Sequence, residues 1–296
     1  MNNRLGYIGL GIMGRPMATH LIQAGYPMSV WARRPESLAP LVAIGANPCD
    51  SAAEVARHSD IVFINVSDTS DVEQVVLGDR GVIEGANPGS VVIDNSTISP
   101  TVTRAIAEQL RQRDIEMLDA PVSGGEQGAV AATLSIMVGG RAEVFERALP
   151  FLKLLGKNIV HVGRNGAGQV AKTCNQVVVA MTIAAVGEAM VVAEASGVDP
   201  AKVREALLGG FAYSKILEVH GQRMLDNNFA PGFKARLHRK DMGIALQTAA
   251  DLGVALPGAA LAAQLINALV GHGGGELDSS AIVKMQRLLG SIETTS

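Results

Sequence analysis

The feature that most constrains the fold is a glycine-rich segment near the N-terminus. It has the spacing GxGxxG, follows a short apolar stretch and precedes a helical pattern that ends at Gly25; its residues are Gly9, Leu10, Gly11, Ile12, Met13 and Gly14. Between a strand and a helix, such glycines permit a tight turn, close approach of the backbone to a pyrophosphate, and close helix packing. The N-terminus of the helix then faces the phosphates. This context predicts dinucleotide binding and disfavours a merely structural turn.

Strand patterns alternate with helical patterns over the first half of the chain. We expect strands over residues 28–32, 61–66, 91–93, 115–119, 134–138 and 159–162, with helices between most of them. Regular alternation predicts an α/β fold with a Rossmann-type, doubly wound parallel sheet and right-handed crossovers. Ligands of such sheets bind beyond the carboxyl ends of the strands.

Strand patterns end after residue 162, and helical periodicity takes over, with C-terminal helices expected over residues 200–208, 214–225, 238–251, 257–271 and 280–289. The chain length suggests about two domains. We expect a dinucleotide-binding Rossmann domain over 1–164, an interdomain helix over 165–195 and an all-helical C-terminal domain over 196–296.

The interdomain helix carries a lysine close to its start. Lys172, Asn175 and Gln176 are spaced i, i+3 and i+4, so one helical face presents an ammonium and two amides. Residues 177–186 are apolar apart from Thr182, which predicts a helix buried on all sides. Because this apolar run is shorter than the ~20 residues that a bilayer requires, we expect no membrane span.

Composition argues against several classes of function. The formal net charge is -3 without a long basic run, which argues against nucleic acid or an anionic membrane as a partner. Two distant cysteines, Cys49 and Cys174, fit a reducing compartment, and the glycine-interrupted N-terminus does not fit a signal peptide. The six histidines lack the spacing of a metal site. We expect a cytoplasmic protein that binds a small molecule and no metal.

Small polar residues follow three of the expected strands, at the edge where ligands bind. One loop begins at Val66, where a strand ends, and continues with Ser67; another contains Ser96 and Thr97. Hydroxyl groups in these loops can contact a nicotinamide ribose or carboxamide, and capping a helix is the alternative for Ser96 and Thr97. The third loop offers backbone N–H groups and a hydroxyl that suit a small carboxylate; its residues are Ser123, Gly124 and Gly125. A flexible turn is the alternative for this loop.

Two cationic positions bear on the cofactor. Arg33 lies about 20 residues past the glycines, where an NAD-selective site usually has an acid. Its guanidinium suits the 2′-phosphate of NADP, so we expect an NAD(P) site that favours NADP; a surface arginine compensated by Glu36 is the alternative. Lys240 belongs to a basic segment that is either a solvated helix start or reaches the cofactor, with Asp241 orienting the lysine.

Four segments together resemble the β-hydroxyacid dehydrogenase family, and the resemblance covers nearly the whole chain. GLGIMGRPMA at 9–18 is similar to the cofactor signature of that family, and DAPVSGGEQGA at 119–129 is similar to its substrate signature. GAGQVAKTCN at 166–175 resembles the catalytic signature, and Lys240-Asp241 falls on a pair at the cofactor side. Four matches in the right order are specific.

The resemblance implies a nicotinamide-dependent reductase of a small 3-oxo carboxylate. It implies that Lys172 is the general acid/base, that Asn175 holds the substrate oxygen and that the loop 123–125 holds the carboxylate. Thr97 and Lys240 match cofactor-contacting positions. The segments 133–140 and 209–221 most resemble members that reduce tartronate semialdehyde to glycerate. The alternatives are 3-hydroxyisobutyrate or 4-hydroxybutyrate/succinic semialdehyde chemistry, or a non-catalytic NADP-binding scaffold.

Two positions depart from the family pattern. Gln176 stands where many members have a second Asn, and Ala32 stands where many have Asn before the arginine. The longer amide of Gln176 puts in doubt any role that depends on a short side chain, and Ala32 loses one possible cofactor contact.

Three aromatic residues are candidates for the wall of the substrate pocket; they are Phe211, Tyr213 and Phe233. The apolar helix also predicts a homodimer or homotetramer.

Overall fold

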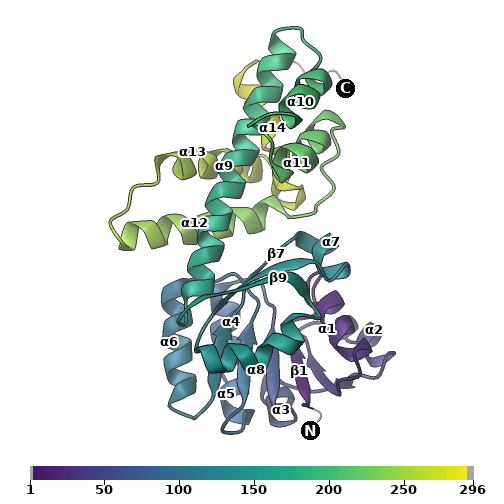
Figure 1. Ribbon diagram of the computed structural model, residues 1–296, viewed down its shortest axis with the longest axis vertical. Coiled ribbons are helices and arrows are strands. Elements are labelled where there is room, and N and C mark those ends of the chain that lie inside the picture. The colour runs from purple at the N-terminus through teal and green to yellow at the C-terminus, as the bar shows by residue number, and fades with distance from the viewer. Residues whose placement is uncertain (1–2, 292–296) are drawn as a thin grey trace. The chain divides into compact units, whose positions relative to one another are not determined.

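The computed structural model describes residues 3–291 and divides the chain into two compact units, Met1–Lys172 and Thr173–Ser296. We call them the N-terminal unit and the C-terminal unit. The long helix α9, Ala167–Ala195, begins in the first unit and continues in the second (Figure 1). Lys172 is therefore the last residue of the N-terminal unit.

The N-terminal unit is built on a single sheet. Within the described residues it has nine strands in the order β3-β2-β1-β4-β5-β6-β8-β7, with β9 paired to β8. The strands are β1 (Leu5–Ile8), β2 (Met28–Trp31), β3 (Asn47–Pro48), β4 (Ile61–Ile64), β5 (Val91–Asp94), β6 (Glu116–Asp119), β7 (Val122–Ser123), β8 (Leu134–Gly139) and β9 (Gly156–Gly163). The first six are parallel, in the order that doubly wound dinucleotide-binding sheets adopt. The predicted α/β class is confirmed.

The last strands of the sheet differ from the prediction. β8 runs antiparallel to β6 and to β7, and β9 runs parallel to β8, so the expectation of a wholly parallel sheet is wrong here. The connection between β6 and β8 contains β7 and the six-residue helix α7 (Gly125–Val130). Strand β7 itself pairs with β8. The connection therefore lacks the long crossover that parallel neighbours need.

Helices cover both faces of this sheet (Figure 1). They are α1 (Gly14–Gln23), α2 (Ala39–Val42), α3 (Ala52–Arg57), α4 (Thr69–Leu77), α5 (Val82–Gly85), α6 (Pro100–Arg111) and α8 (Ala142–Leu152). Because side chains alternate along a strand, Tyr7 and Phe63 enter the core beneath α1 and α8, while Ile8 and Ile64 enter the core beneath α3, α4 and α6. Burial on both faces explains why these strands have continuous apolar sequences.

The C-terminal unit is helical, as predicted. Beyond α9 its helices are α10 (Pro200–Leu208), α11 (Lys215–Leu225), α12 (Ala235–Asp251), α13 (Pro257–Gly271) and α14 (Ile282–Leu289). Helix α12 begins three residues before the expected start at His238. Buried Asp278 explains this start, because its carboxylate accepts the N–H groups of Gly232 and Phe233 at 2.9 and 3.0 Å and so fixes the chain that enters the helix.

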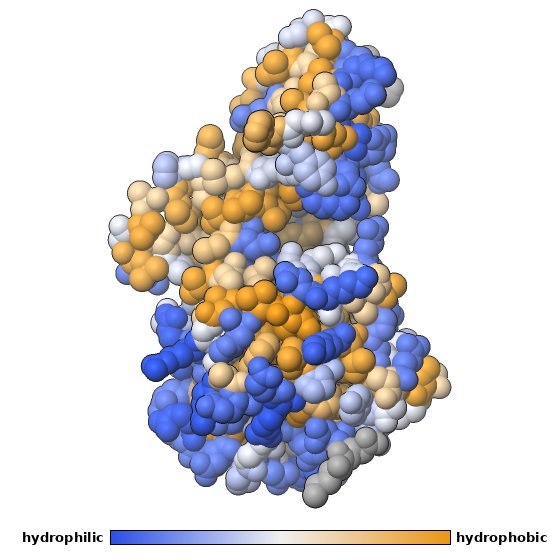
Figure 2. Space-filling model, in the orientation of Figure 1, coloured by the Kyte–Doolittle hydropathy of each residue, from blue (hydrophilic) through white to orange (hydrophobic). Residues whose placement is uncertain are grey.

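Helix α9 is buried on one face only, so the expectation of burial on all sides is wrong. Ala180 and Ile183 are buried in the core of the C-terminal unit, whereas Val178 is 64% exposed and Met181 42% exposed. By length and composition alone the helix could span a membrane: it has 29 residues, and an 18-residue window within it reaches a mean hydropathy of 1.9. Core helices of compact proteins pass the same test. Figure 2 shows apolar residues on the visible surface of this unit.

Candidate active site

The glycine-rich loop joins β1 to α1 beside the end of β4. Gly9 has φ +91°, and a Cβ there would lie 2.1 Å from the carbonyl oxygen of Asn65. A Cβ at Gly14 would lie 2.0 Å from the carbonyl oxygen of Gly9, so both positions exclude side chains by packing. A Cβ at Gly11 would meet no atom within 4 Å. Protein packing thus leaves the backbone at Gly11 open to a ligand, which fits the phosphates of a dinucleotide at the start of α1.

The loops that follow β4 and β5 are joined by the side chain of Ser96. Its Oγ accepts the backbone N–H of Val66 at 2.9 Å, and its own N–H donates to Asp94 Oδ1 at 2.9 Å. Ser96 is buried, and its hydroxyl is engaged in a hydrogen bond within the protein. Ser67 is exposed and Thr97 half-buried in the same two loops, so they remain accessible at the carboxyl edge of the sheet.

Gln169 connects the first turn of α9 to the loop after β5. Its side chain accepts the N–H of Ile98 at 3.2 Å and donates to the carbonyl oxygen of Ser96 at 2.8 Å. The side chain is fully buried, and both of its polar atoms are used. Sequence reasoning did not identify this residue, although a glutamine one helical turn before a candidate catalytic lysine was the available signal.

Asp119, at the end of β6, holds the start of α9. Oδ1 accepts the N–H of Gly166 at 2.7 Å, and Oδ2 accepts the N–H of Gln169 at 3.0 Å, two donors that lack partners within the helix. Burial raises the pKa of the Asp119 carboxyl, and these N–H groups oppose the rise only in part. Gly168 allows the close approach, because a Cβ there would lie 2.7 Å from the carbonyl oxygen of Asp119.

Lys172 lies one turn after Gln169, on the part of α9 that Asp119 and Gln169 fix. Its exposure is 7%, which is low for a lysine.

The loop expected to hold a carboxylate begins at Ser123, four residues after Asp119. There Ser123 is half-buried at the end of β7, and φ is +136° at Gly124 and +62° at Gly125, values that favour glycine.

The candidate residues of the C-terminal unit form a hydrogen-bonded chain. Asn175 Nδ2 donates to Gln176 Oε1 at 2.8 Å, and Gln176 Nε2 donates to Asp241 Oδ2 at 2.6 Å. Asp241 Oδ1 lies 3.0 Å from Nζ of Lys240, so these two side chains form an ion pair. Of the aromatic candidates, Phe233 is partly buried, whereas Phe211 and Tyr213 are exposed on the chain between α10 and α11.

Arg33 follows β2 and is 79% exposed. It pairs with Asp71 on α4 at 3.1 Å, and not with Glu36, the partner that the sequence offered as an alternative.

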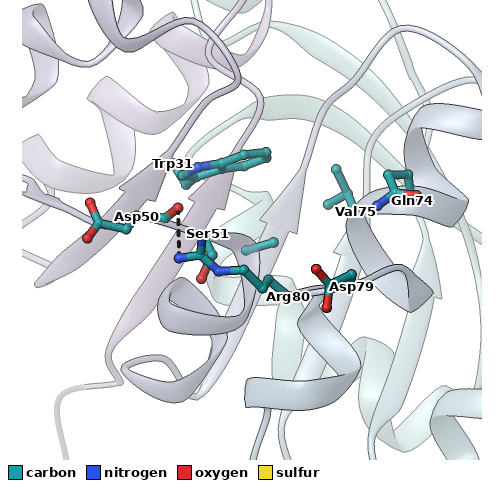
Figure 3. A pocket seen from close by; sticks show the side chains of 8 residues that line it. Trp31, Asp50, Ser51, Gln74, Val75, Asp79 and Arg80 are labelled. Carbon is teal, nitrogen blue, oxygen red and sulfur yellow. Dashed lines mark hydrogen bonds between the residues drawn. The ribbon is translucent and has the colours of Figure 1, made fainter.

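A hollow lies at the carboxyl end of β2, where Trp31 borders it (Figure 3). Its other lining residues come from the start of α3, from α4 and from the chain after α4; they are Asp50, Ser51, Ala52, Gln74, Val75, Asp79 and Arg80.

Family models match both halves of the chain. Residues 4–163 match the NAD binding domain of 6-phosphogluconate dehydrogenase. Residues 166–286 match the NAD-binding domain of NADP-dependent 3-hydroxyisobutyrate dehydrogenase. Together with the open glycine loop, these matches define an oxidoreductase that binds NAD(P).

Individual relatives narrow the class. The chain is 48% identical to 2-hydroxy-3-oxopropionate reductase of Escherichia coli over 97% of this chain and 98% of that protein. It is 38% identical to 3-hydroxyisobutyrate dehydrogenase of Pseudomonas aeruginosa, over 96% and 98% of the two chains. A solved structure of 3-hydroxyisobutyrate dehydrogenase from Mycobacterium tuberculosis with L-serine superposes with a TM-score of 0.90 at 32% identity, covering 97% of this chain and 100% of that one. The chain belongs to the β-hydroxyacid dehydrogenase family and is an NAD(P)-dependent 3-hydroxyacid dehydrogenase.

The raised pKa of Asp119 predicts how its contribution to stability depends on pH. Between the ordinary value of 3.8 and the raised value, the folded protein keeps a proton that the unfolded chain has released. Acidification through this window therefore stabilises the wild type but not Asp119→Asn. We expect the free energy of unfolding of the wild type, relative to Asp119→Asn, to rise as pH is lowered from neutrality in urea denaturation experiments.

Asp60 supplies the matched control for this measurement. Hydrogen bonding to the Arg4 side chain lowers the pKa of the Asp60 carboxyl, so its stabilising contribution is lost as pH falls through the lowered value. The same comparison with Asp60→Asn should have the opposite sign and a small size, because that pair is exposed. A wild-type advantage over Asp119→Asn that shrinks on acidification would contradict the account of Asp119.

Proposed function

We propose that this enzyme reduces tartronate semialdehyde (2-hydroxy-3-oxopropanoate) to D-glycerate with NAD(P)H. The observation that carries the proposal is the 48% identity to the E. coli 2-hydroxy-3-oxopropionate reductase over nearly the full length of both chains. The 3-hydroxyisobutyrate dehydrogenase relative is less similar, at 38% identity.

In this mechanism Lys172 protonates the carbonyl oxygen of the substrate. The bound nicotinamide supplies the hydride. Lys172 is buried on a helical turn that Asp119 and Gln169 fix, so the ammonium is held in place and partly shielded from water. A positioned ammonium both donates a proton and stabilises the negative charge that develops on the oxygen.

Other residues of the chain orient the substrate. Asn175 lies one turn after Lys172 on α9, and its amide is suited to hold the substrate oxygen. We assign the carboxylate to the loop of Ser123, Gly124 and Gly125, where a hydroxyl and backbone N–H groups accompany the left-handed glycine conformations. Fixing both ends of a small oxo acid brings its carbonyl carbon into a defined position before reaction.

The cofactor lies, in our proposal, along the carboxyl edge of the sheet. The backbone from Gly9 to Gly14 would hold the pyrophosphate, and the loops with Val66, Ser67 and Thr97 would follow the nicotinamide side. The hollow beside Trp31 would receive the adenosine end, next to Arg33. Arg33 would exchange Asp71 for a 2′-phosphate, which favours NADP, and Lys240 would contact the cofactor, as the family resemblance implies.

We also propose a cytoplasmic homodimer or homotetramer without a membrane or nucleic-acid partner. The exposed apolar residues of the C-terminal unit support association; they include Val178, Met181 and Val192 on α9 and Leu261 on α13. A second copy of the chain would remove such surface from water.

Comparison of oxo acids tests the substrate. We expect the highest kcat/KM for tartronate semialdehyde among a panel that includes methylmalonate semialdehyde and succinic semialdehyde, each assayed with NADH and NADPH. The α-hydroxyl of tartronate semialdehyde gives it a polar contact that the other two acids lack, and unpaired polar groups in a site lower the specificity constant. A best specificity constant for methylmalonate semialdehyde would replace our substrate assignment with the 3-hydroxyisobutyrate reaction.

Substitution of the lysine tests the mechanism. We expect Lys172→Ala to lower kcat by roughly 10²- to 10⁴-fold, the range that general acid catalysis contributes, while NADPH binding measured by fluorescence persists. Exposed Lys153 provides a matched control, and Lys153→Ala should retain full activity. Full activity in Lys172→Ala would exclude the lysine as the proton donor.

Charge reversal at Arg33 tests the cofactor preference. We expect Arg33→Asp to raise the KM for NADPH about 10- to 100-fold, because a charge-assisted contact becomes a repulsion, and to leave the KM for NADH nearly unchanged. The neighbouring exposed arginine is the control: Arg34→Asp should have little effect on either value. An unchanged KM for NADPH in Arg33→Asp would refute the assignment of the 2′-phosphate to this residue.

A further inference from the structure

We propose that Gln176 is a positioning residue that fixes which way the amide of Asn175 faces. The geometry behind the proposal is the chain of contacts from Asn175 through Gln176 to Asp241 and Lys240, which lies wholly within the C-terminal unit. The inference rests on the proposed role of Asn175 in holding the substrate oxygen.

The carboxylate of Asp241 sets the direction of the chain. An ionised carboxylate only accepts hydrogen bonds, so Gln176 must turn its NH₂ group towards Asp241, 2.6 Å away. The carbonyl oxygen of Gln176 then faces Asn175 and accepts from Nδ2 at 2.8 Å. With one N–H engaged, Asn175 keeps a carbonyl oxygen and a second N–H for a ligand. The orientation of an amide that sequence alone leaves ambiguous is thereby defined.

Burial and charge make this direction costly to reverse. Gln176 is 3% exposed and Asp241 4% exposed, so water does not readily replace either partner. Lys240 Nζ lies 3.0 Å from Oδ1 of Asp241, so the second oxygen of this carboxylate is engaged in an ion pair. A flipped Gln176 would direct its carbonyl oxygen at that carboxylate, which is repulsive.

The length of the glutamine side chain is what joins the two helices. Neighbouring residues on a helix point about 100° apart and do not normally face each other. Gln176 nevertheless contacts both Asn175 beside it on α9 and Asp241 on α12. An asparagine at 176 has one methylene fewer and would not span both partners. The departure from the family pattern noted in the sequence thus has a structural use.

A double-mutant cycle tests whether Gln176 acts through Asn175. We expect Gln176→Met, which keeps the length but removes the amide, to lower kcat/KM for the oxo acid about tenfold, the size of one buried hydrogen bond. In an Asn175→Ala background the same substitution should change kcat/KM by less than about twofold, because residues acting as one unit are not additive. The dissociation constant of NADPH should not change in Gln176→Met.

A matched control separates positioning from folding. Gln286 is another buried glutamine of this unit. Its Nε2 donates to the carbonyl oxygen of Ala184 at 2.8 Å, farther along α9 than Asn175. Gln176→Met and Gln286→Met should each lower the melting temperature, because each removes a buried hydrogen bond, but Gln286→Met should leave kcat/KM unchanged. Gln176→Asn should not restore the activity that Gln176→Met loses relative to the wild type.

Each result decides between explanations. Equal losses for Gln176→Met in the wild-type and Asn175→Ala backgrounds would overturn the positioning role while leaving the proposed reaction intact. A weaker affinity for NADPH in Gln176→Met would overturn it in favour of an effect through Lys240. Unchanged kcat/KM in the single variant Asn175→Ala would refute the proposed role of Asn175 and with it the role of Gln176. Inactivity of the wild type on every oxo acid would refute the proposed function itself.

Discussion

The capture of the first N–H groups of α9 by the Asp119 carboxylate is the contact on which the candidate site depends. A helix start has donors without partners, and a buried carboxylate has acceptors that need them, so each satisfies the other. The contact joins the end of β6 to the helix that carries Lys172. Gly139 and Gly168 are required around it, because side chains at either position would collide with Asp119.

The neighbouring loops depend on the same arrangement. Gln169 extends the contact from Asp119 to the chain after β5, and Ser96 extends it from there to the chain after β4. Buried hydrogen bonds between loops therefore help to organise the edge of the sheet. Buried polar networks of this kind stabilise one arrangement strongly because an unpaired member would be costly. That property suits the proposed binding of a dinucleotide and a small acid at this edge.

Much of the fold could be predicted from local sequence. The GxGxxG spacing, the strand–helix alternation and the helical C-terminal half follow from periodicity, and α10 and α13 begin and end at the predicted residues. Strand direction after β6 could not be predicted, because it depends on how β7 pairs with β8. The exposed face of α9 was missed since composition cannot show which side of an apolar helix other segments cover.

The site divides in the same way. Motifs identified Lys172, Asn175 and the glycine loops, whose chemistry is visible in residue type and spacing. Gln169, Asp71 and the Gln176 contact were not found, because each depends on a partner distant in sequence: Ser96, Arg33 and Asp241. Long-range pairs of ordinary polar residues leave no local pattern.

The continuity of α9 has a kinetic consequence. The division between the two compact units falls directly after Lys172, yet Lys172 and Asn175 lie on one uninterrupted helix, about 4.5 Å apart along its axis. Any motion that leaves this helix intact keeps the backbones of Lys172 and Asn175 in a fixed relation. The backbone entropy of aligning these two residues is lost once, when the chain folds, and is not lost again in each turnover.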